Sequence, residues 1–437
     1  MSRFQIILTI IFVAVIVVGV GVFAFLSAGG GSSSTTRVVI WGSLDARVMD
    51  ELVAKMKFKY QADLNFDYIQ KDPATFDQNF VEALATGNGP DIILLPQDEI
   101  IRNQDKLYTI PFSSLSQRTF LDTFIDEGQL YLGSTGSIGI PFIVDPLVMY
   151  WNRDLVTGAG FAKPASTWNE LFVQIPKLTI KDSALNVTTS AIAMGEWSNV
   201  RYSKEILGAL IMQAGNPIVI RDPQSRPGFD TYKSILADSL DKSVPPASDA
   251  LGFFTEFSNP SKNTYSWNRS LRDSQAAFIN GDLAYYLGFA SELKLLKAKN
   301  PNLNYDMATL PQPLGTAKRT TFGKMQAFAI VKRSPNISDS FKLIVELTSS
   351  RTVAEFALIS GLAPVRRDLL QNPPSDPYSP IVYNSALFSS GWFDPDRVKT
   401  TDIFKRMTTG VTTGSSRPIE AVTKAHQEIT LLLNSNN

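Results

Sequence analysis

The stretch from residue 37 to residue 95 determines the fold class. It opens with the apolar run RVVIWG (37–42) and closes with the apolar run DIILL (91–95). Three segments lie between these two runs, in this order: a helical pattern at residues 45–60, a second strand-like run at residues 64–69 and another helical pattern at residues 76–85. The run at residues 91–95 is then the third strand. Continuous apolar strands that alternate with amphipathic helices are typical of a parallel sheet covered on both faces. We therefore expect an α/β protein.

The overall composition excludes several classes of protein. The chain has 437 residues, 41 Lys and Arg against 41 Asp and Glu, no Cys and a single His, His426. A net charge of zero argues against nucleic acid as a partner, because nucleic-acid proteins carry an excess of Lys and Arg for the phosphates. Without Cys there are no disulfides, thiolate zinc sites or cysteine nucleophiles. No P-loop, complete dinucleotide-binding loop or nucleophile elbow occurs, so we expect no cofactor, no metal and no catalytic residue.

The N-terminus has the pattern of a membrane segment. Residues 4–26 contain no charged side chain, and a helix of this length spans about 35 Å, enough to cross a hydrocarbon core of about 30 Å. Because Arg3 precedes the run, the positive-inside rule directs the rest of the chain to the extracytoplasmic side. The run is longer than the apolar stretch of a signal peptide, so we favour an uncleaved transmembrane anchor in the cell membrane over a cleaved signal. Residues 27–36, SAGGGSSSTT, then form a flexible linker.

A second informative segment is IGIPFIVDPLVMYWN (138–152), which is extended in character and interrupted by Pro141 and Pro146. After it the pattern is mostly helical, and strand-like runs return at residues 283–287 and 326–331. The length of the chain predicts two or three domains, at about 100–200 residues per domain.

Five short segments, taken in order, resemble the extracellular solute-binding proteins of ABC importers, the large family that includes maltose-binding protein. They are ATGNGPDI (85–92), GIPF (139–142) with YWNRDL (150–155), PASTWNEL (164–171), AFINGDLA (277–284) and GLAPVRRD (361–368). The chain departs from the family pattern in two places. Trp151 separates Tyr150 from Asn152, and the Cys that carries a lipid in many bacterial members is absent, which leaves residues 4–26 as the expected anchor.

The resemblance implies a two-lobed periplasmic-binding-protein fold of type II, with the ligand in the cleft between the lobes and closure by hinge bending. We expect an N-terminal lobe from residues 37–143 with 303–335, and a C-terminal lobe from residues 144–302 with 336–437. The implied partners are a small-molecule ligand and the permease subunits of an ABC importer, with the protein itself a monomer.

The resemblance implies three ligand-binding residues, the cleft carboxylates Asp98 and Asp145 and the sugar-stacking aromatic Trp197. Five further candidates are aromatic or polar side chains in loops or at strand ends: Trp41, Ser43, Trp267, Phe289 and Trp392. Carboxylates accept hydrogen bonds from vicinal hydroxyls, and aromatic rings offer flat apolar faces that match the C–H face of a pyranose. Each type also has a structural alternative: Trp41 could pack in the core, Asp98 could be a solvated loop acid, and Asp145 could initiate a turn.

The resemblance implies a membrane-tethered binding protein that captures a ligand and delivers it to a permease, and the aromatic and carboxylate residues favour a sugar or oligosaccharide as that ligand. Two alternatives remain at this point. One is a glycoside-processing enzyme that uses Asp98 and Asp145 as paired carboxylates, and the other is a surface sensor built on the same fold.

Overall fold

In the computed structural model, which describes residues 37–62, 64–226, 228–316 and 318–436, the chain forms two compact units. Of the described residues, the first unit takes those of 37–143 together with those of 225–230 and 325–371. The second unit takes the remaining segments, 144–224, 231–324 and 372–436.

These bounds differ from those expected for the lobes. Residues 303–324 belong to the second unit, and residues 336–371 belong to the first. The pairing of the strands gives the reason for the first difference, because residues 305–309 form a strand that pairs within the second unit. The helices of residues 337–360 pack instead with elements of the first unit.

The predicted membrane segment (4–26) and linker (27–36) lie outside the described residues. Among the helices that the structure describes, none combines the length and the apolar character that crossing a membrane requires.

The first unit is built on a sheet in the order β2–β1–β3–β13. β1 (Val38–Gly42) lies between β2 (Phe66–Gln70) and β3 (Ile92–Pro96) and is parallel to both. β13 (Thr321–Ile330) runs antiparallel to β3 through residues 326–330. The run from β1 to β3 confirms the predicted α/β class.

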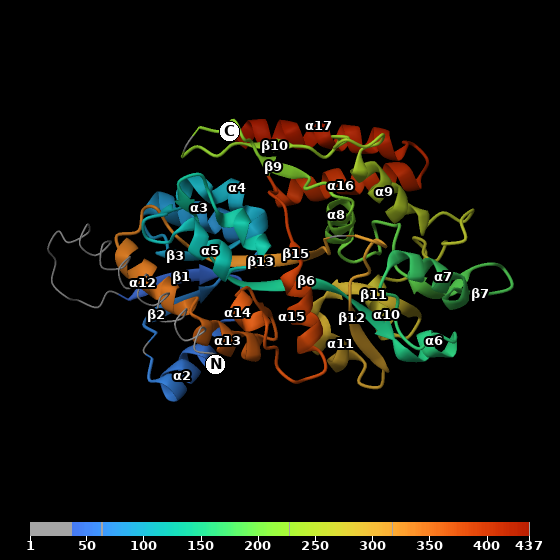
Figure 1. Ribbon diagram of the computed structural model, residues 1–437, viewed down its shortest axis with the longest axis horizontal. Coiled ribbons are helices and arrows are strands. Elements are labelled where there is room, and N and C mark those ends of the chain that lie inside the picture. Colours follow the sequence, from blue (N-terminus) through green and yellow to red (C-terminus); the bar gives the residue numbers. More distant parts are fainter. Residues whose placement is uncertain (1–36, 63, 227, 317, 437) are drawn as a thin grey trace. The chain divides into compact units, whose positions relative to one another are not determined.

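The helices of the first unit cover both faces of this sheet (Figure 1). α3 (Phe76–Thr86) lies on one face, and α2 (Ala46–Tyr60) lies on the other, where it packs against α13 (Ser350–Ser360). α2 begins where predicted, because the Asp45 carboxylate accepts a hydrogen bond from the backbone N–H of Arg47 at 3.0 Å. The remaining elements of the unit are η1 (Gln97–Glu99), α4 (Ile100–Asn103), η2 (Gln104–Lys106), β4 (Ile110–Pro111), α5 (Gln117–Thr123), η3 (Asp126–Tyr131), β5 (Gly136–Ser137), α12 (Ile337–Leu347), β14 (Ala363–Pro364) and α14 (Arg367–Leu370).

The strands of the second unit are centred on β11 (Leu283–Phe289). β11 is antiparallel to the second half of β6 (Ile140–Asn152) and parallel to β8 (Val187–Ile192). β12 (Tyr305–Thr309) pairs with β6, and β7 (Ile180–Lys181) pairs with β8, both antiparallel. Because β8 and β11 are parallel, their carboxyl ends lie at the same edge of the sheet.

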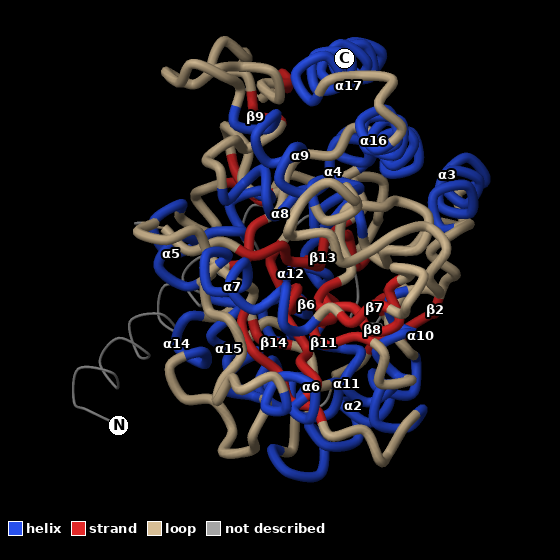
Figure 2. Tube along the Cα trace, turned by 90° about the vertical axis from the view of Figure 1, so that its right-hand side faces the viewer, coloured by secondary structure: helices blue, strands red, loops and turns tan. Residues whose placement is uncertain are grey.

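A layer of helices belongs to the second unit (Figures 1 and 2). α8 (Ser203–Gln213) packs against α9 (Pro246–Glu256), and α17 (Pro418–Asn436) packs against both α9 and α16 (Arg397–Thr412). The other elements are α6 (Arg153–Gly158), α7 (Trp168–Leu178), β9 (Val219–Arg221), β10 (Tyr232–Ser234), α10 (Ser274–Ile279), η4 (Ala290–Glu292), α11 (Leu293–Lys299), α15 (Ser379–Leu387) and β15 (Ser389–Ser390).

α16 is started by a side-chain cap. It begins after Asp396, whose carboxylate accepts hydrogen bonds from the backbone N–H groups of Val398 and Lys399 at 3.1 and 3.0 Å. This cap starts the helix in a polar stretch where apolar spacing gives no signal.

Candidate functional site

In the first unit, the candidate residues lie at the carboxyl ends of two parallel strands. Trp41 lies at the end of β1, Ser43 directly follows that strand, and Asp98 lies in η1 directly after β3. Ligands of α/β sheets bind outside the carboxyl ends of the strands. The structure therefore places these three residues at one edge of the sheet.

Lys71 joins this edge and was not predicted. It directly follows β2, and its Nζ lies 3.7 Å from the centre of the Trp41 ring. Trp41 is only 8% exposed, so its indole serves both as core and as the platform for this ammonium group. A Lys that follows an apolar strand is a weak signal by itself, since the pairing of β1 with β2 is needed to place it beside Trp41.

Tyr131 fixes the end of β3 beside Asp98. Its hydroxyl donates to the carbonyl oxygens of Leu95 at 2.9 Å and Met325 at 3.2 Å, so it ties β3 to β13. Burial, with added repulsion from the carboxylates of Glu127 and Asp98, raises the pKa of Tyr131 well above its usual value. The phenol is therefore a permanent hydrogen-bond donor in this position.

In the second unit, a cluster of charged and aromatic side chains surrounds the carboxyl end of β11. Phe289 is the last residue of the strand, and Tyr202, directly before α8, packs edge-on against its ring with centroids 4.8 Å apart. Asp145 lies on β6 near the same end, because Leu147 is paired with Phe289. The cluster thus combines aromatic rings with a carboxylate.

A buried carboxylate, that of Glu292, connects the side chains of this cluster by hydrogen bonds. Its oxygens accept hydrogen bonds from the hydroxyls of Tyr202 at 3.1 Å and Tyr286 at 2.8 Å, and from the side-chain amide of Gln275. Burial raises the pKa of Glu292, and the hydrogen bonds from the two tyrosines oppose that rise. Since Glu292 is only 7% exposed, we assign it to holding Tyr202 in place.

Asp145 is half-buried in this cluster. Its Oδ1 accepts a hydrogen bond from the backbone N–H of Ser291 at 3.0 Å. Burial raises the pKa of Asp145 to about 6; the bonds from Ser291 and the charge of Lys324 act in the opposite direction, and Glu292 adds to the rise. The carboxylate is therefore ionised at neutral pH and held in a fixed direction.

Lys324 completes the cluster and was also missed by the sequence prediction. Its Nζ lies 4.0 Å from the centre of the Phe289 ring and 4.8 Å from that of Tyr202, and it forms an ion pair with Glu205 at 3.1 Å. Its side chain is 43% exposed. No motif marks Lys324, because β13 brings it to residues more than thirty positions away in the sequence.

The predicted loop aromatics differ sharply in exposure. Trp197, in the connection between β8 and α8, is half-buried. Trp267 is 1% exposed, and Trp392 is 3% exposed and stacks on Phe404 with ring centroids 5.9 Å apart. The expectation that Trp267 and Trp392 offer ring faces in polar loops is at odds with this burial, which leaves no open face on either indole. Phe289 is 2% exposed, and Lys324 and Tyr202 already cover its ring.

Comparison with known proteins identifies similar sequences over most of the chain. The family model of the bacterial extracellular solute-binding proteins matches residues 53–379. A binding protein of Brucella abortus is 21% identical over 316 residues, which make up 70% of this chain and 69% of that protein. The maltooligosaccharide ABC transporter solute-binding lipoprotein of Streptococcus pneumoniae serotype 4 is 24% identical over 276 residues, covering 59% of this chain and 56% of the lipoprotein.

The fold is shared with solved structures. The sugar-binding protein MalE of the phytopathogen Xanthomonas citri superposes with a TM-score of 0.73 at 20% sequence identity, covering 92% of this chain and 98% of that one. At this level of identity the similarity shows that the two chains share a fold.

Proposed function

Because the chain belongs to the bacterial extracellular solute-binding proteins, we propose that it captures a sugar or oligosaccharide outside the cytoplasm and delivers it to the permease of an ABC importer. The names of the lipoprotein from Streptococcus pneumoniae and of the protein from Xanthomonas citri support a carbohydrate ligand. The observation that carries the proposal is the cluster of Asp145, Tyr202 and Lys324 at the carboxyl end of β11.

This cluster offers the groups that a polyhydroxylated ligand requires. The ionised Asp145 accepts hydrogen bonds from hydroxyls, Lys324 donates to ring and hydroxyl oxygens, and the phenol of Tyr202 offers an aromatic edge. Lys324 is balanced by Glu205 at 3.1 Å, so the exposed part of the cluster has no strong excess of positive charge. Such a balance favours a neutral sugar over a strongly anionic ligand.

We further propose which of the predicted residues contact ligand. On the first unit they are Trp41, Ser43 and Asp98, to which we add Lys71. On the second unit they are Asp145 and Trp197, to which we add Tyr202 and Lys324; Phe289 supports the last two. Trp267 and Trp392 are left out because their rings are buried.

The same proposal includes the way in which the protein is held at the cell surface. The uncharged run at residues 4–26 would anchor the protein as an uncleaved helix, with residues 27–36 as the linker. We propose that the anchored protein is a monomer that binds without turnover. Alkaline carbonate extraction of membranes should leave the full-length chain in the pellet; release of a shorter chain that begins after residue 26 would refute the anchor.

A thermal-shift screen of the full-length protein in detergent tests the ligand class. A compound that binds only the folded state raises the melting temperature by mass action. We expect shifts with maltose, maltotriose or other oligosaccharides, and recovery of the sugar unchanged after prolonged incubation. Shifts with amino acids, peptides or polyamines but not with sugars would refute the carbohydrate ligand, and shortened products would indicate a glycoside-processing enzyme.

A further inference from the structure

The connection between β8 and α8, residues 193–202, has an unusual backbone. We call it the β8–α8 loop; it carries Trp197, and Tyr202 is its last residue. Gly195 has φ +98° and Tyr202 has φ +61°, so left-handed residues stand on both sides of Trp197. A Cβ at position 195 would lie 2.6 Å from the backbone nitrogen of Ser258, which makes glycine necessary there. Such a backbone persists only where the surroundings hold it.

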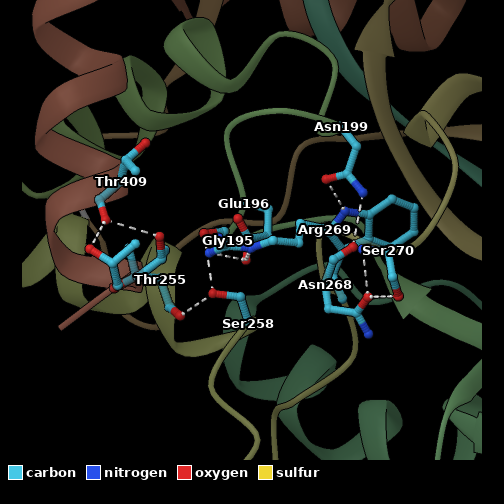
Figure 3. A network of polar contacts seen from close by, with 12 residues as sticks. Gly195, Glu196, Asn199, Thr255, Ser258, Asn268, Arg269, Ser270 and Thr409 are labelled. Carbon is cyan, nitrogen blue, oxygen red and sulfur yellow. Dashed lines mark hydrogen bonds and ion pairs between the residues drawn. The ribbon is translucent and has the colours of Figure 1, made fainter.

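Asn199 is the central attachment point of this loop (Figure 3). Its Nδ2 donates to the carbonyl oxygens of Asn268 at 2.9 Å and Leu271 at 2.8 Å, and its Oδ1 accepts from Nε1 of Trp267 at 3.0 Å. The backbone carbonyl of Asn199 also accepts from the N–H of Ser274 at 2.9 Å. Asn199 is 9% exposed, so these bonds are shielded from water.

Trp267 is itself held rigidly. Its backbone N–H donates to the carbonyl of Phe257 at 3.1 Å, and its indole is 1% exposed. The neighbouring residue, Ser266, exchanges hydrogen bonds with the end of β8: its Oγ donates to the carbonyl of Ile192 at 2.7 Å and accepts from the N–H of Ile192 at 3.2 Å. The indole N–H therefore reaches Asn199 from a support that is fixed to the sheet.

We propose that Asn199 and Trp267 are positioning residues that hold the β8–α8 loop in its ligand-binding conformation. Neither presents an open surface to a ligand; they act through the loop, by fixing Trp197 and Tyr202. The inference rests on the proposed function for its ligand, but the hydrogen bonds that carry it do not depend on that function. It assigns Trp267 a role in binding that differs from the direct contact expected from its place in a polar segment.

Removing the indole N–H alone isolates this role. Trp267→Phe keeps an aromatic ring in the site but leaves Oδ1 of Asn199 without the donor that holds it, and a buried acceptor without a partner is costly. Trp168 provides a matched control. It is 5% exposed, and its Nε1 donates to the side-chain oxygen of Gln213 at 2.8 Å, so Trp168→Phe removes the same type of bond in the same unit, away from the loop.

Hydrogen–deuterium exchange of the full-length protein measures how readily the β8–α8 loop opens. In Trp267→Phe we expect the amides of residues 193–202 to exchange about tenfold faster, because local opening becomes easier. Trp168→Phe should leave the exchange of this peptide unchanged. Equal exchange of the loop in the wild type and Trp267→Phe would overturn the inference, whatever the protein binds.

Titration with maltotriose then tests the link to ligand binding. We expect Trp267→Phe to raise the dissociation constant about tenfold and Trp168→Phe to leave it unchanged. When Trp197 and Tyr202 have both been replaced by Ala, the loop no longer carries the side chains that Trp267 positions. Adding Trp267→Phe to that double variant should therefore have little further effect on the dissociation constant. Faster exchange with unchanged affinity would overturn the positioning role. Absence of maltotriose binding by the wild type would instead count against the proposed function, while the exchange result would still decide whether Asn199 and Trp267 hold the loop. If Trp267→Phe does not fold, Asn199→Asp takes its place, because it removes both hydrogen bonds that Nδ2 donates. The same faster exchange and the same weaker binding are expected of it, and unchanged exchange or unchanged affinity would overturn the inference.

Discussion

Replacing Asp145 with Asn should stabilise the free protein, and increasingly so as the pH rises. Burial raises the pKa of Asp145 to about 6, against a usual value of 3.8. Because the pKa is higher in the folded state, that state binds more protons between these two values, and the ionised carboxylate costs stability. The cost is absent below the unfolded-state pKa, grows through the window between the two pKa values and is complete above the folded-state pKa. A difference of about two pKa units corresponds to about 3 kcal/mol at neutral pH.

Urea unfolding of the wild type and Asp145→Asn, followed by tryptophan fluorescence, measures this cost. The advantage of the variant in free energy of unfolding should grow by about 2 kcal/mol between about pH 4.5 and about pH 7.5. Asp122→Asn, at a carboxylate whose side chain is 73% exposed on α5, is the control. An advantage that does not change with pH would refute the reasoning, since it would mean that the carboxylate of Asp145 is not desolvated. The same variant should bind maltotriose more weakly, because it loses the ionised acceptor.

Three other substitutions test separate parts of the structure. Lys324→Met should raise the dissociation constant for maltotriose at least about tenfold in calorimetric titration, because the ammonium group is lost while the apolar stem can remain against the rings; unchanged affinity would remove Lys324 from the proposed site. Gly195→Ala should lower the melting temperature by several degrees, since φ is +98° and the new Cβ would contact the backbone of Ser258; an unchanged transition would show that the loop can relax. Lys204→Met should lower the free energy of unfolding in urea by about 3 kcal/mol. The reason is that the carboxylate of Asp394, whose side chain is 3% exposed, loses the ammonium group 2.7 Å away. A loss under about 1 kcal/mol would mean that water replaces the ammonium group.

The local elements of the first unit could be predicted because their signals are local. The apolar runs at residues 37–42 and 91–95 became β1 and β3, and the cap at Asp45 lies within two residues of the N–H that it binds. The hairpin of β9 and β10 was not predicted, since three-residue strands are too short to show a period. After residue 303 the two compact units divide the chain differently from the expected lobes, because the division depends on which strands pair.

The candidate site shows the same contrast between local and distant information. Trp41 and Ser43 could be selected because the end of their strand can be read from the sequence, and Asp98 because it matches the family pattern. Lys71 and Lys324 could not be selected, because their neighbours are set by pairing between distant strands. The burial of Trp267 could not be predicted for a similar reason. Its neighbours in the sequence are polar, whereas the hydrogen-bond partner of its indole is Asn199, 68 positions earlier.

The strand order of the first unit has a consequence for how the protein is made. β3 is complete at residue 96, but the strand that covers its free edge, β13, ends at residue 330. A ribosome that adds about 5–20 residues per second needs about 10–50 seconds to synthesise the chain between them. Throughout that interval the apolar β3 presents unpaired N–H and C=O groups, as an open sheet edge does. The nascent chain therefore passes through a stage in which a chaperone or a neighbouring nascent chain can take the place of β13, and slow translation of the second unit prolongs that stage.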